Sequence, residues 1–380
     1  MFINFFLKKR NKVDVLVDAR CIEWGNGGVS RILTHVLKRW HNERKENVTL
    51  LFQSSIPEHV YLGFPNFKCH LLKGPKFITK YRILSEQILI PFVLFLYKPR
   101  IFFSTWYTAP IFIGKTQLVL GLWDISFSTH PEHYRYIHRF SLGFFSRLSA
   151  KMAHTIITCS DYDASQINHY YNIPLKKIHI WYITADERFF VKVNNNVIEE
   201  FHSKMKIPNR FILSLGVIYN RRHVDYLINA FYSFSNHHPE VYLIIVGKDV
   251  TNPKQNIQEL CNTVSDKIIY LEHIEDKYLP VIYQAADVFY CVSSVDGETL
   301  LIKEALAGAT PVLTSKLLIH SIGGFCNLIE DPQDSESIKQ ALIQFYNNLS
   351  EAKKSALLGQ SYVRKISWTN VTDDSLNVFW

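Results

Sequence analysis

The sequence predicts an α/β protein with two Rossmann-like domains, each built on a parallel sheet. The length of 380 residues exceeds that of a typical single domain. Short apolar segments, typical of buried strands, alternate with amphipathic helical segments in both halves of the chain. One unit shows the pattern clearly, because a strand (residues 286–292), a polar turn, a helix (300–307) and a second strand (312–314) follow within about 30 residues.

The polar turn of this unit follows the carboxyl end of a strand, where open α/β sheets bind ligands. Asp296 lies in the turn, and Glu304 lies about two helical turns later. Two such carboxylates can accept hydrogen bonds from sugar and ribose hydroxyls. The amides of Thr299, Leu300 and Leu301 at the helix start can meet a phosphate. The alternative is a plain helix with a structural acid at each end.

The stretch resembles the signature of the family 4 retaining glycosyltransferases, which have the GT-B fold. The second half of that signature is a Glu, then Ala, a hydrophobic residue, Ala, two small residues and Thr-Pro-Val, and residues 304–312 match it position by position. The first half differs. Asp296 stands where a Glu is expected, Glu298 replaces an aromatic residue, Thr299 replaces a Gly, and Leu301 replaces a frequent Pro.

Composition and charge limit the class of protein. The 47% hydrophobic and 20% charged residues are ordinary for a globular protein. No apolar run reaches the roughly 20 residues that span a bilayer, and the nearest one, residues 88–97, predicts a buried helix. The net charge of +8 suits anionic lipid or phosphorylated partners. Sequence-specific nucleic-acid motifs are absent, so we expect no nucleic acid as a partner.

The chain termini and cysteines indicate the compartment. Aromatic residues precede a basic cluster within positions 2–12, which suits an anionic membrane surface, and a frayed, solvated terminus is the alternative. No export signal is recognisable. The six scattered cysteines predict free thiols in a reducing cytosol. We therefore expect a cytoplasmic protein, peripheral at the inner face of the cytoplasmic membrane.

A glycine-rich loop separates the strand expected at residues 13–17 from the helix expected at 30–40. Gly25, Gly27 and Gly28 allow the backbone to approach a phosphate closely, or merely form a turn. The loop is similar to the first loop of the same family, which closes on the donor diphosphate and the acceptor. The matching residues are Asp18, Arg20, Gly28, Val29 and Arg31, whereas Ser30 replaces a Gly.

Asp124 follows the strand expected at residues 117–122 and matches the Asp of the family's His-Asp pair. Trp123 takes the place of the His, which in the family points at the reacting sugar. The resemblance therefore gives no single catalytic acid or base in the first domain. His130 could replace that His only by conjecture, and a structural role for it is the favoured interpretation.

Two further segments of the first half have competing interpretations. The helix expected at residues 133–154 has an aromatic side and several basic residues, so it could face a membrane or the acceptor, but an ordinary surface helix is the default. Asp161 and Asp163 look like a metal-binding Asp-x-Asp pair. Ser160, three residues before Asp163, instead predicts a helix-capping box without a metal.

The second half begins with the strand expected at residues 211–215, followed by Gly216. This segment resembles the family's donor-phosphate motif, with Arg222 at the position of its Lys and Arg221 at that of a frequent neighbour. A guanidinium can grip a diphosphate bidentately and offset its charge as the bond to the sugar breaks. Val217 replaces a frequent Arg, so one cation is missing.

The resemblance spans about residues 14–380 and implies two facing domains with a nucleotide-sugar in the cleft between them. Residues 1–187 would form the acceptor-binding domain and residues 188–362 the nucleotide-sugar-binding domain. Residues 363–380 would form a C-terminal helix that packs back on the first domain.

The resemblance also implies a role for each site residue. Arg222, helped by Arg221 or Lys303, would bind the diphosphate, and Glu304 would hold the ribose. Asp296 and the loop amides from Gly297 onward would hold the transferred sugar. The acceptor would attack near Gly28 and Asp124. We expect no metal, because the arginines and the helix N-terminus supply the positive charge.

The resemblance favours a bacterial mannosyltransferase of O-antigen or lipopolysaccharide assembly. GDP-mannose is the first expectation for the donor and a UDP-sugar the second, with a polyprenyl-diphosphate-linked glycan as acceptor. One alternative is a sugar-nucleotide epimerase of the same fold. Another is a non-catalytic scaffold of a polysaccharide assembly complex, which the altered positions Trp123, Val217 and Asp296 favour.

Overall fold

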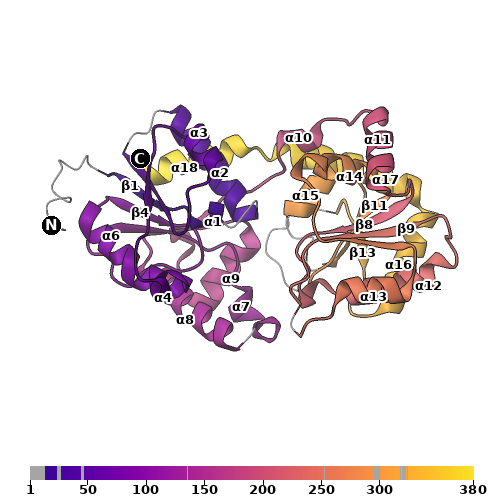
Figure 1. Cartoon of the computed structure of the whole chain (residues 1–380), viewed down its shortest axis with the longest axis horizontal. Coiled ribbons are helices and arrows are strands. Elements are labelled where there is room, and N and C mark those ends of the chain that lie inside the picture. The colour runs from indigo at the N-terminus through magenta and orange to yellow at the C-terminus, as the bar shows by residue number, and fades with distance from the viewer. Residues whose placement is uncertain are drawn as a thin grey trace. The chain divides into compact units, whose positions relative to one another are not determined.

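The computed structural model describes residues 13–23, 27–43, 47–134, 136–251, 253–294, 300–316, 318, 322 and 324–380. The chain forms two compact units (Figure 1). The first comprises the residues up to Ile183 together with Trp368–Trp380, and the second comprises Thr184–Ser367. The boundary expected at 187/188 lies a few residues after the observed division. The boundary expected at 362/363 falls inside helix α17 (Leu349–Lys365), which stays within the second unit.

The first unit is built on a seven-stranded parallel sheet with the order β3-β2-β1-β4-β5-β6-β7. Its strands are β1 (Val15–Asp18), β2 (Val48–Phe52), β3 (Lys68–Leu71), β4 (Ile101–Ser104), β5 (Gln117–Gly121), β6 (Thr155–Thr158) and β7 (Ile178–Ile180). The inner strands are buried on both faces, which explains their continuous apolar runs. The edge strands β3 and β7 are more exposed, so their mixed sequences did not predict strands.

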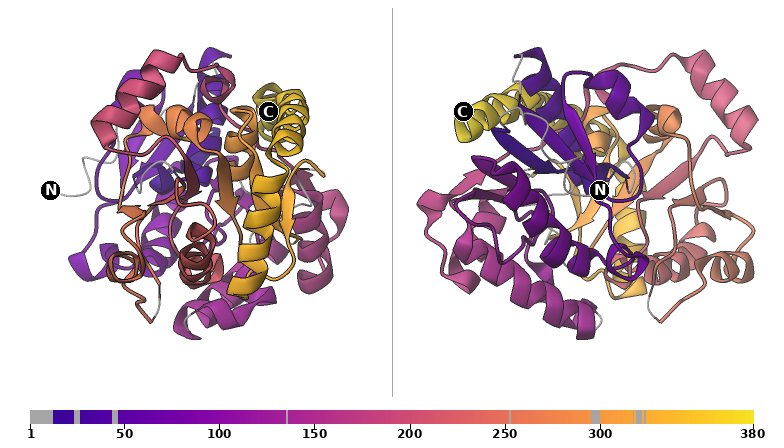
Figure 2. Two further views of the ribbon diagram at one scale, coloured as in Figure 1. Left: turned by 90° about the vertical axis from the view of Figure 1, so that its right-hand side faces the viewer. Right: turned by 60° about the vertical axis from the view of Figure 1, so that its left-hand side comes forward.

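Helices cover both faces of the first sheet. In Figures 1 and 2, α2, α3 and α18 lie on one side, and α4, α6, α8 and α9 lie on the other. The helices are α1 (Arg20–Glu23), α2 (Gly28–Asn42), α3 (Glu58–Gly63), α4 (Lys76–Thr79), α5 (Arg82–Leu84), α6 (Ile90–Tyr97), α7 (Ser126–Thr129), α8 (Tyr136–Met152), α9 (Asp161–Tyr171) and α18 (Trp368–Phe379), with the π-helix η2 (Ser85–Leu89) and the 3-10 helices η3 (Pro131–His133) and η4 (Leu175–Lys177).

The C-terminal helix α18 belongs to the first unit because it packs on α2. The Trp40 indole Nε1 donates to Ser375 Oγ at 3.0 Å, and the Trp368 ring stacks on His35 with centroids 4.0 Å apart. Trp40 and Phe379 are fully buried in this contact. The last helix is therefore part of the core of the first unit.

The second unit is built on a six-stranded parallel sheet with the order β10-β9-β8-β11-β12-β13. Its strands are β8 (Phe211–Leu215), β9 (Tyr242–Val246), β10 (Ile268–Leu271), β11 (Val288–Cys291), β12 (Val312–Ser315) and β13 (Asn327–Ile329). Its helices are α10 (Glu187–Phe190), α11 (Asn195–Met205), α12 (Val224–Ser235), α13 (Ile257–Val264), α14 (Leu279–Ala285), α15 (Leu300–Ala307), α16 (Ser335–Asn347) and α17, with the 3-10 helices η5 (Asn220–Arg222) and η6 (Asp276–Tyr278).

Two apolar cores, one on each face, hold the second sheet. Helices α12, α13 and α16 contribute to one core, and α11, α14, α15 and α17 contribute to the other. Both units are thus parallel α/β units with helices on both faces, as the sequence predicted. No helix within the described residues is long and apolar enough to cross a membrane.

Each sheet has one position where the strand order reverses. The chain fills the first sheet outward from β1 to β3, and then returns to place β4 on the other side of β1. The second sheet does the same at β8 and β11. Loops that leave such neighbouring strands diverge and open a crevice at their carboxyl ends, where parallel sheets bind ligands.

Candidate active site

Glycines shape the switch point of the second unit. Gly216 follows β8 with φ 124°, and Gly247 follows β9 with φ 149°. Residues other than glycine rarely adopt these backbone angles. A Cβ on Gly247 would lie 1.9 Å from the Gly216 carbonyl oxygen, and a Cβ on Gly216 would lie 2.8 Å from Leu301 Cδ1. The absent side chains therefore let the first turn of α15 pack directly on the β8 loop.

The two predicted arginines lie in η5, the short helix that follows this loop. Arg222 Nη1 donates to Sγ of Cys291, the last residue of β11, at 3.2 Å. The Arg221 guanidinium lies 4.2 Å from the ring centre of Tyr219, and the Arg221 carbonyl accepts a bond from the Ser294 amide at 2.9 Å. Both cations therefore lie where β8 and β11 end, at the start of the loop that carries Asp296.

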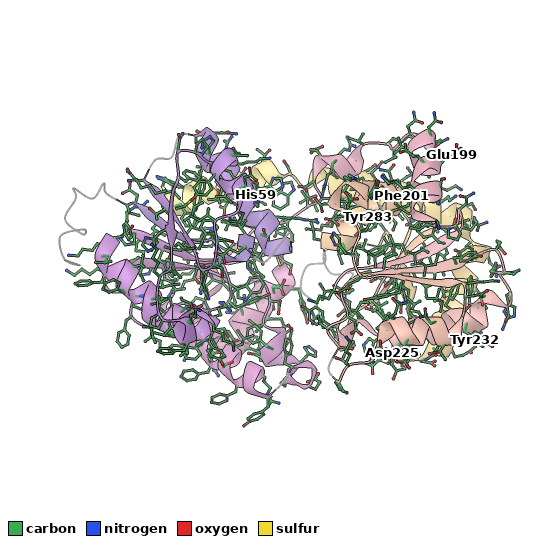
Figure 3. All side chains as sticks on the ribbon, viewed as in Figure 1. His59, Glu199, Phe201, Asp225, Tyr232 and Tyr283 are labelled. Atoms are coloured by element: carbon green, nitrogen blue, oxygen red, sulfur yellow. The ribbon has the colours of Figure 1, made fainter. Side chains whose placement is uncertain are left out.

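Glu304 and Lys303 lie buried in α15, each with 1% of its surface exposed. The Tyr283 hydroxyl of α14 donates to Glu304 Oε2 at 3.3 Å. Tyr283, labelled in Figure 3, is itself fully buried in the second unit. Tyr283 could not be predicted from the sequence, because a tyrosine in an apolar helix gives no sign that a distant carboxylate accepts a hydrogen bond from it.

The second half of the signature has a structural function beyond Glu304. The Thr310 amide donates to the Ala305 carbonyl at 2.9 Å, and Ala309 adopts the left-handed φ of 57°. This pattern ends α15 in a Schellman-type turn. Thr310 Oγ1 also donates to the Tyr283 carbonyl at 2.7 Å. The turn thus fixes α15 against α14 and holds Glu304 next to Tyr283.

Three predicted donor residues lie outside the described residues. They are Asp296, Gly297 and Thr299, and their roles stay predictions. Leu300 and Leu301 begin α15, so the first amides of this helix lie beside the β8 loop. Within the described residues of this unit, Gly216 lies against Leu301, and Arg222 lies against Cys291. The glycine, the arginines and the first turn of α15 therefore meet at the β8/β11 switch point, whereas Lys303 and Glu304 lie buried further along α15.

Gly28 lies at the switch point of the first unit, where it is the first residue of α2. Its preceding residue, Gly27, caps α2 without a side-chain hydrogen bond. The first amides of a helix have no partner within the helix and suit an anionic group. This geometry is compatible with the predicted role of Gly28.

A buried ionic network lies behind this edge and explains the Asp-Ala-Arg sequence. Arg20 bonds Asp18 through two nitrogens, Nε to Oδ1 at 2.7 Å and Nη2 to Oδ2 at 2.6 Å. Its Nη2 lies 3.6 Å from Glu86 Oε2 of η2, and Arg82 Nη2 lies 3.1 Å from the same oxygen. The four charges cancel. Asp18 and Arg20, which match the family's first loop, therefore bond each other and hold the start of this loop in place.

The pKa values of the two acids in this network shift in opposite directions. Burial alone would raise the pKa of Asp18, but the Arg20 guanidinium outweighs burial and holds this pKa below its ordinary value. Burial dominates at Glu86 and raises its pKa despite Arg82 and Arg20. The sequence did not predict Glu86 and Arg82 as members of this network. Their only signal was a charged pair, four residues apart, in a largely apolar stretch.

Asp124 lies three residues after the end of β5, and its carboxylate accepts from three donors. Oδ1 accepts from the Ser126 amide at 2.8 Å and the Ser126 hydroxyl at 2.6 Å, and Oδ2 accepts from the Tyr107 hydroxyl at 3.0 Å. Trp123 is turned into the core, where its Nε1 donates to the Thr105 carbonyl at 2.8 Å. The side chain in the family's His position therefore has a packing role.

We expect Asp124→Asn to leave transfer within about tenfold of the wild-type rate, because an amide keeps an oxygen for Ser126. Asp124→Ala should lower the free energy of unfolding by about 1–3 kcal/mol, since it removes the acceptor of the partly buried Tyr107 hydroxyl. Steady-state rates and urea unfolding measure the two effects. A complete loss of transfer in a stably folded Asp124→Asn protein would instead make the carboxylate catalytic.

The structure also describes Ser160 and His130, the other two features that the sequence singled out in the first unit. The Asp163 amide donates to Ser160 Oγ at 3.1 Å, so Ser160 is the N-cap of α9 as expected. His130 Nδ1 lies 2.9 Å from the hydroxyl of its neighbour Thr129. Among the residues with described placement, no group of three or more His, Cys, Asp and Glu side chains could hold a metal ion.

One protein family matches a stretch within the second unit. Residues 197–357 match the family described as glycosyl transferases group 1. The O-antigen chain mannosyltransferase B of Escherichia coli is 24% identical over 264 residues, which are 67% of this chain and 68% of that protein. The mannosylfructose-phosphate synthase of Agrobacterium fabrum is 23% identical over 223 residues, which are 54% of this chain and 48% of that protein.

Solved structures share the fold over nearly the whole chain. Anabaena HepE, solved with UDP and glucose, has a TM-score of 0.76 at 14% identity, with 97% of this chain and 99% of that chain covered. WaaG, a glycosyltransferase involved in lipopolysaccharide biosynthesis, has a TM-score of 0.75 at 14% identity, with the same coverage of 97% and 99%. Residues 197–357 therefore form a glycosyl transferases group 1 domain, and the chain is a glycosyltransferase of the GT-B type.

Proposed function

We propose that the chain is a retaining hexosyltransferase that moves mannose from a nucleotide-sugar to a growing, lipid-linked bacterial glycan. The observation that carries the proposal is the composition of the β8/β11 switch point. Glycines with positive φ, two arginines and the start of a helix with a buried glutamate meet there. A diphosphate requires cations and close backbone approach, and a ribose requires a hydrogen-bond acceptor.

In this proposal Arg222 binds the donor diphosphate, with Arg221 or Lys303 beside it. Glu304, held by Tyr283, accepts hydrogen bonds from the ribose hydroxyls. Asp296 and the amides of its loop hold the transferred sugar. No metal and no other cofactor take part, because guanidinium groups and the N-terminus of α15 supply the positive charge.

The chemical step is a front-side displacement at the anomeric carbon. The bond from this carbon to the donor phosphate oxygen breaks, and the electron pair stays on the nucleoside diphosphate. The acceptor hydroxyl oxygen bonds the same carbon from the same face, and its proton passes to the departing phosphate oxygen. Arg222 stabilises the negative charge that grows on the diphosphate.

Relatives and charge support the finer assignments. The relatives include two O-antigen chain mannosyltransferases, which favours mannose and therefore GDP-mannose as donor. Structural neighbours were solved with UDP or UDP-glucose, so a UDP-sugar is the second candidate. The net charge of +8 favours a polyprenyl-diphosphate-linked acceptor and a peripheral position on an anionic membrane.

The first experiment is thermal unfolding of the purified chain with a panel of nucleotides and nucleotide-sugars. We expect GDP or GDP-mannose to raise the unfolding temperature, because a ligand that binds only the folded state stabilises it. Arg222→Ala and Glu304→Ala should each abolish this increase. Glu351→Ala is the matched control, since Glu351 is exposed on α17 and should leave the increase unchanged.

The outcomes separate the candidate functions. An increase with one nucleotide, lost in both site variants, supports the donor site and identifies the base. Release of an altered sugar without any acceptor would identify an epimerase. No increase with any nucleotide at millimolar concentration would contradict a transferase and favour the scaffold, which the buried Trp123 in the family's His position also favours.

A further inference from the structure

The outer face of the segment from α4 to α6 exposes a row of apolar side chains. Six residues, together called the outer stripe, are each between 39% and 71% exposed: Phe77, Tyr81, Leu84, Ile88, Phe92 and Phe95. The sequence predicted a buried helix at residues 88–97, and the structure corrects this expectation. Ile90, Val93 and Leu94 face the core, whereas Ile88, Phe92 and Phe95 face outward.

The outer stripe repeats every three or four residues, which is the period of one helix face. Helices α5, η2 and α6 run without a break from Arg82 to Tyr97. Their inner side already carries Ser85 and Glu86 in the ionic network and Val93 and Leu94 in the apolar core. The segment is therefore apolar on both sides, and packing within the first unit explains only one of them. A contiguous exposed apolar surface of this kind marks an interaction site.

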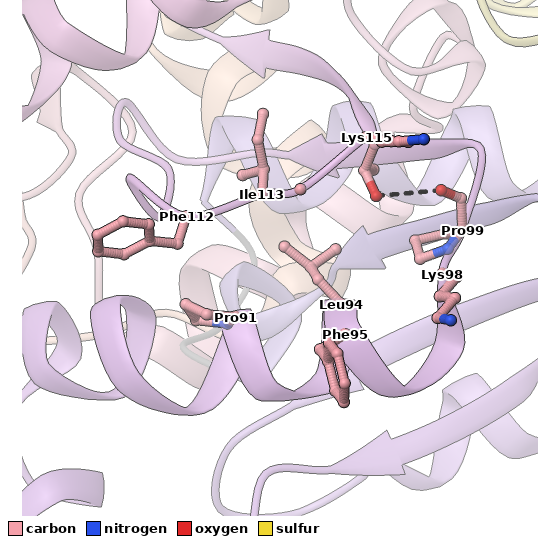
Figure 4. A pocket seen from close by; sticks show the side chains of 10 residues that line it. Pro91, Leu94, Phe95, Lys98, Pro99, Phe112, Ile113 and Lys115 are labelled. Carbon is pink, nitrogen blue, oxygen red and sulfur yellow. Dashed lines mark hydrogen bonds between the residues drawn. The ribbon is translucent and has the colours of Figure 1, made fainter.

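An apolar pocket adjoins the end of the outer stripe (Figure 4). Its volume is about 620 Å³, and it lies between α6 and the loop that leads to β5. Leu94 and Phe95 of α6 and Phe112 and Ile113 of the loop are among the residues that line it. Phe112 is 77% exposed. The pocket extends the apolar surface from the helix onto the neighbouring loop.

Positive charge surrounds this surface. Residues 73–116 contain a single acid, Glu86, which is buried in the ionic network. The same segment contains seven basic residues. Arg82 belongs to the ionic network, and the other six are Lys73, Lys76, Lys80, Lys98, Arg100 and Lys115. Lys80 Nζ lies 5.8 Å from the ring centre of Tyr81, and Lys98 Nζ lies 5.9 Å from that of Phe95. Cations thus stand beside the exposed rings.

Helix α8, on the same side of the sheet, also exposes aromatic side chains next to a basic residue. Tyr136, Phe140 and Phe144 are exposed along one side of α8, and the Arg139 guanidinium lies 6.0 Å from the ring centre of Tyr136. Figures 1 and 2 draw α4, α6 and α8 on one face of the sheet. Ala109 connects η2 with α8, since its carbonyl accepts from Gln87 of η2 and its amide donates to Ser149 of α8.

We propose that the outer stripe and the adjoining pocket form a docking surface for an anionic lipid bilayer. Exposed phenylalanines insert at the boundary of head groups and acyl chains, and lysines beside them attract anionic head groups. A second copy of the chain is a poorer occupant, because a two-fold contact would bring the same lysines face to face. The inference specifies the membrane contact within the proposed function, but its test needs neither donor nor acceptor.

The test is co-sedimentation of the full chain with vesicles of phosphatidylcholine alone or of equal parts phosphatidylcholine and phosphatidylglycerol. We expect binding to the anionic vesicles, weakened by salt. Phe92→Ser, Phe95→Ser and Phe112→Ser combined should lower the partition coefficient by roughly 100-fold or more, because three exposed rings can no longer insert. Lys98→Glu with Lys115→Glu should lower binding to anionic vesicles only.

The matched control is Leu357→Ser with Leu358→Ser, a pair of exposed apolar residues on α17 in the second unit. This pair should bind vesicles as the wild type does. The inference is overturned if the triple phenylalanine variant binds normally, or if the wild type binds neither vesicle. It is also overturned if Phe5→Ser with Phe6→Ser removes all binding while the triple variant keeps it. A wild-type dimer that the triple variant converts to a monomer, without any effect on vesicles, would assign the surface to a second copy.

These outcomes are independent of the donor site. A protein that binds vesicles but no nucleotide would keep this inference and contradict the proposed transferase. A protein that binds a nucleotide but no vesicle would overturn this inference and leave the proposed transferase standing. The thermal unfolding experiment contains no vesicles, so the two results cannot be confused.

Discussion

Arg222→Ala is expected to lower kcat/KM for sugar transfer by about 100- to 1,000-fold, because a positioned donor to a developing charge contributes about this much. The guanidinium lies where β8 and β11 end, with Nη1 3.2 Å from Cys291 Sγ. In the proposed step it meets the diphosphate as the bond to the sugar breaks, so its loss should affect kcat as well as donor affinity. Initial rates of nucleotide release, with the donor found by thermal unfolding, measure the effect.

Two further variants make the Arg222 result specific. Arg222→Lys should recover part of the activity, because an ammonium keeps the charge but lacks the bidentate geometry. Arg210→Ala is the matched control, since Arg210 bonds Asp287 at 2.8 Å on the surface of the same unit. It should transfer sugar at the wild-type rate. If Arg222→Ala proved as active as Arg210→Ala, other groups would have to hold the diphosphate.

Arg20→Ala is expected to lower the free energy of unfolding by about 3–5 kcal/mol, because removing one partner of a buried ion pair leaves uncompensated charge. Arg20 and Asp18 have side chains only 1% and 3% exposed, and Glu86 Oε2 lies 3.6 Å from the same guanidinium. Neither carboxylate can reach water easily. The unfolding temperature of the first unit should fall by about 10 °C. Calorimetry of the full chain measures this change.

The matched control for Arg20 is Arg39→Ala. Arg39 pairs with Glu43 at 3.3 Å and with Asp373 at 2.8 Å, but all three side chains are more than a third exposed. Such surface pairs contribute about 0–1 kcal/mol. Equal losses in the two variants would show that the buried carboxylates find other compensation. The interpretation of the Asp-Ala-Arg sequence as an internal anchor would then be wrong.

The sequence predicted regular elements well where an apolar run is bounded by turn residues. Strand β4 and helix α15 have the expected bounds, and Ser160 caps α9 as expected. The strand expected at residues 286–292 is shorter, because the Ala286 amide still bonds the end of α14. The edge strands β3 and β7 were missed, because a half-exposed strand lacks a continuous apolar run.

The candidate site was predictable where function depends on local order along the chain. Gly216, Arg221 and Arg222 follow one strand, and Glu304 follows another, so their spacing identifies them. Tyr283 could not be predicted as the partner of Glu304, and Glu86 could not be predicted as a partner of Arg20. Both contacts join residues that only the folded chain brings together.

The sequence by itself determined that this chain forms parallel α/β units with a group of glycines and arginines at the end of a strand. These properties depend on the period of apolar residues and on local backbone freedom. The tertiary structure decided which strands are neighbours, and hence that the loops after β8 and β11 meet. It also decided that the outer stripe is exposed, because an apolar helix face has the same period whether or not another element covers it.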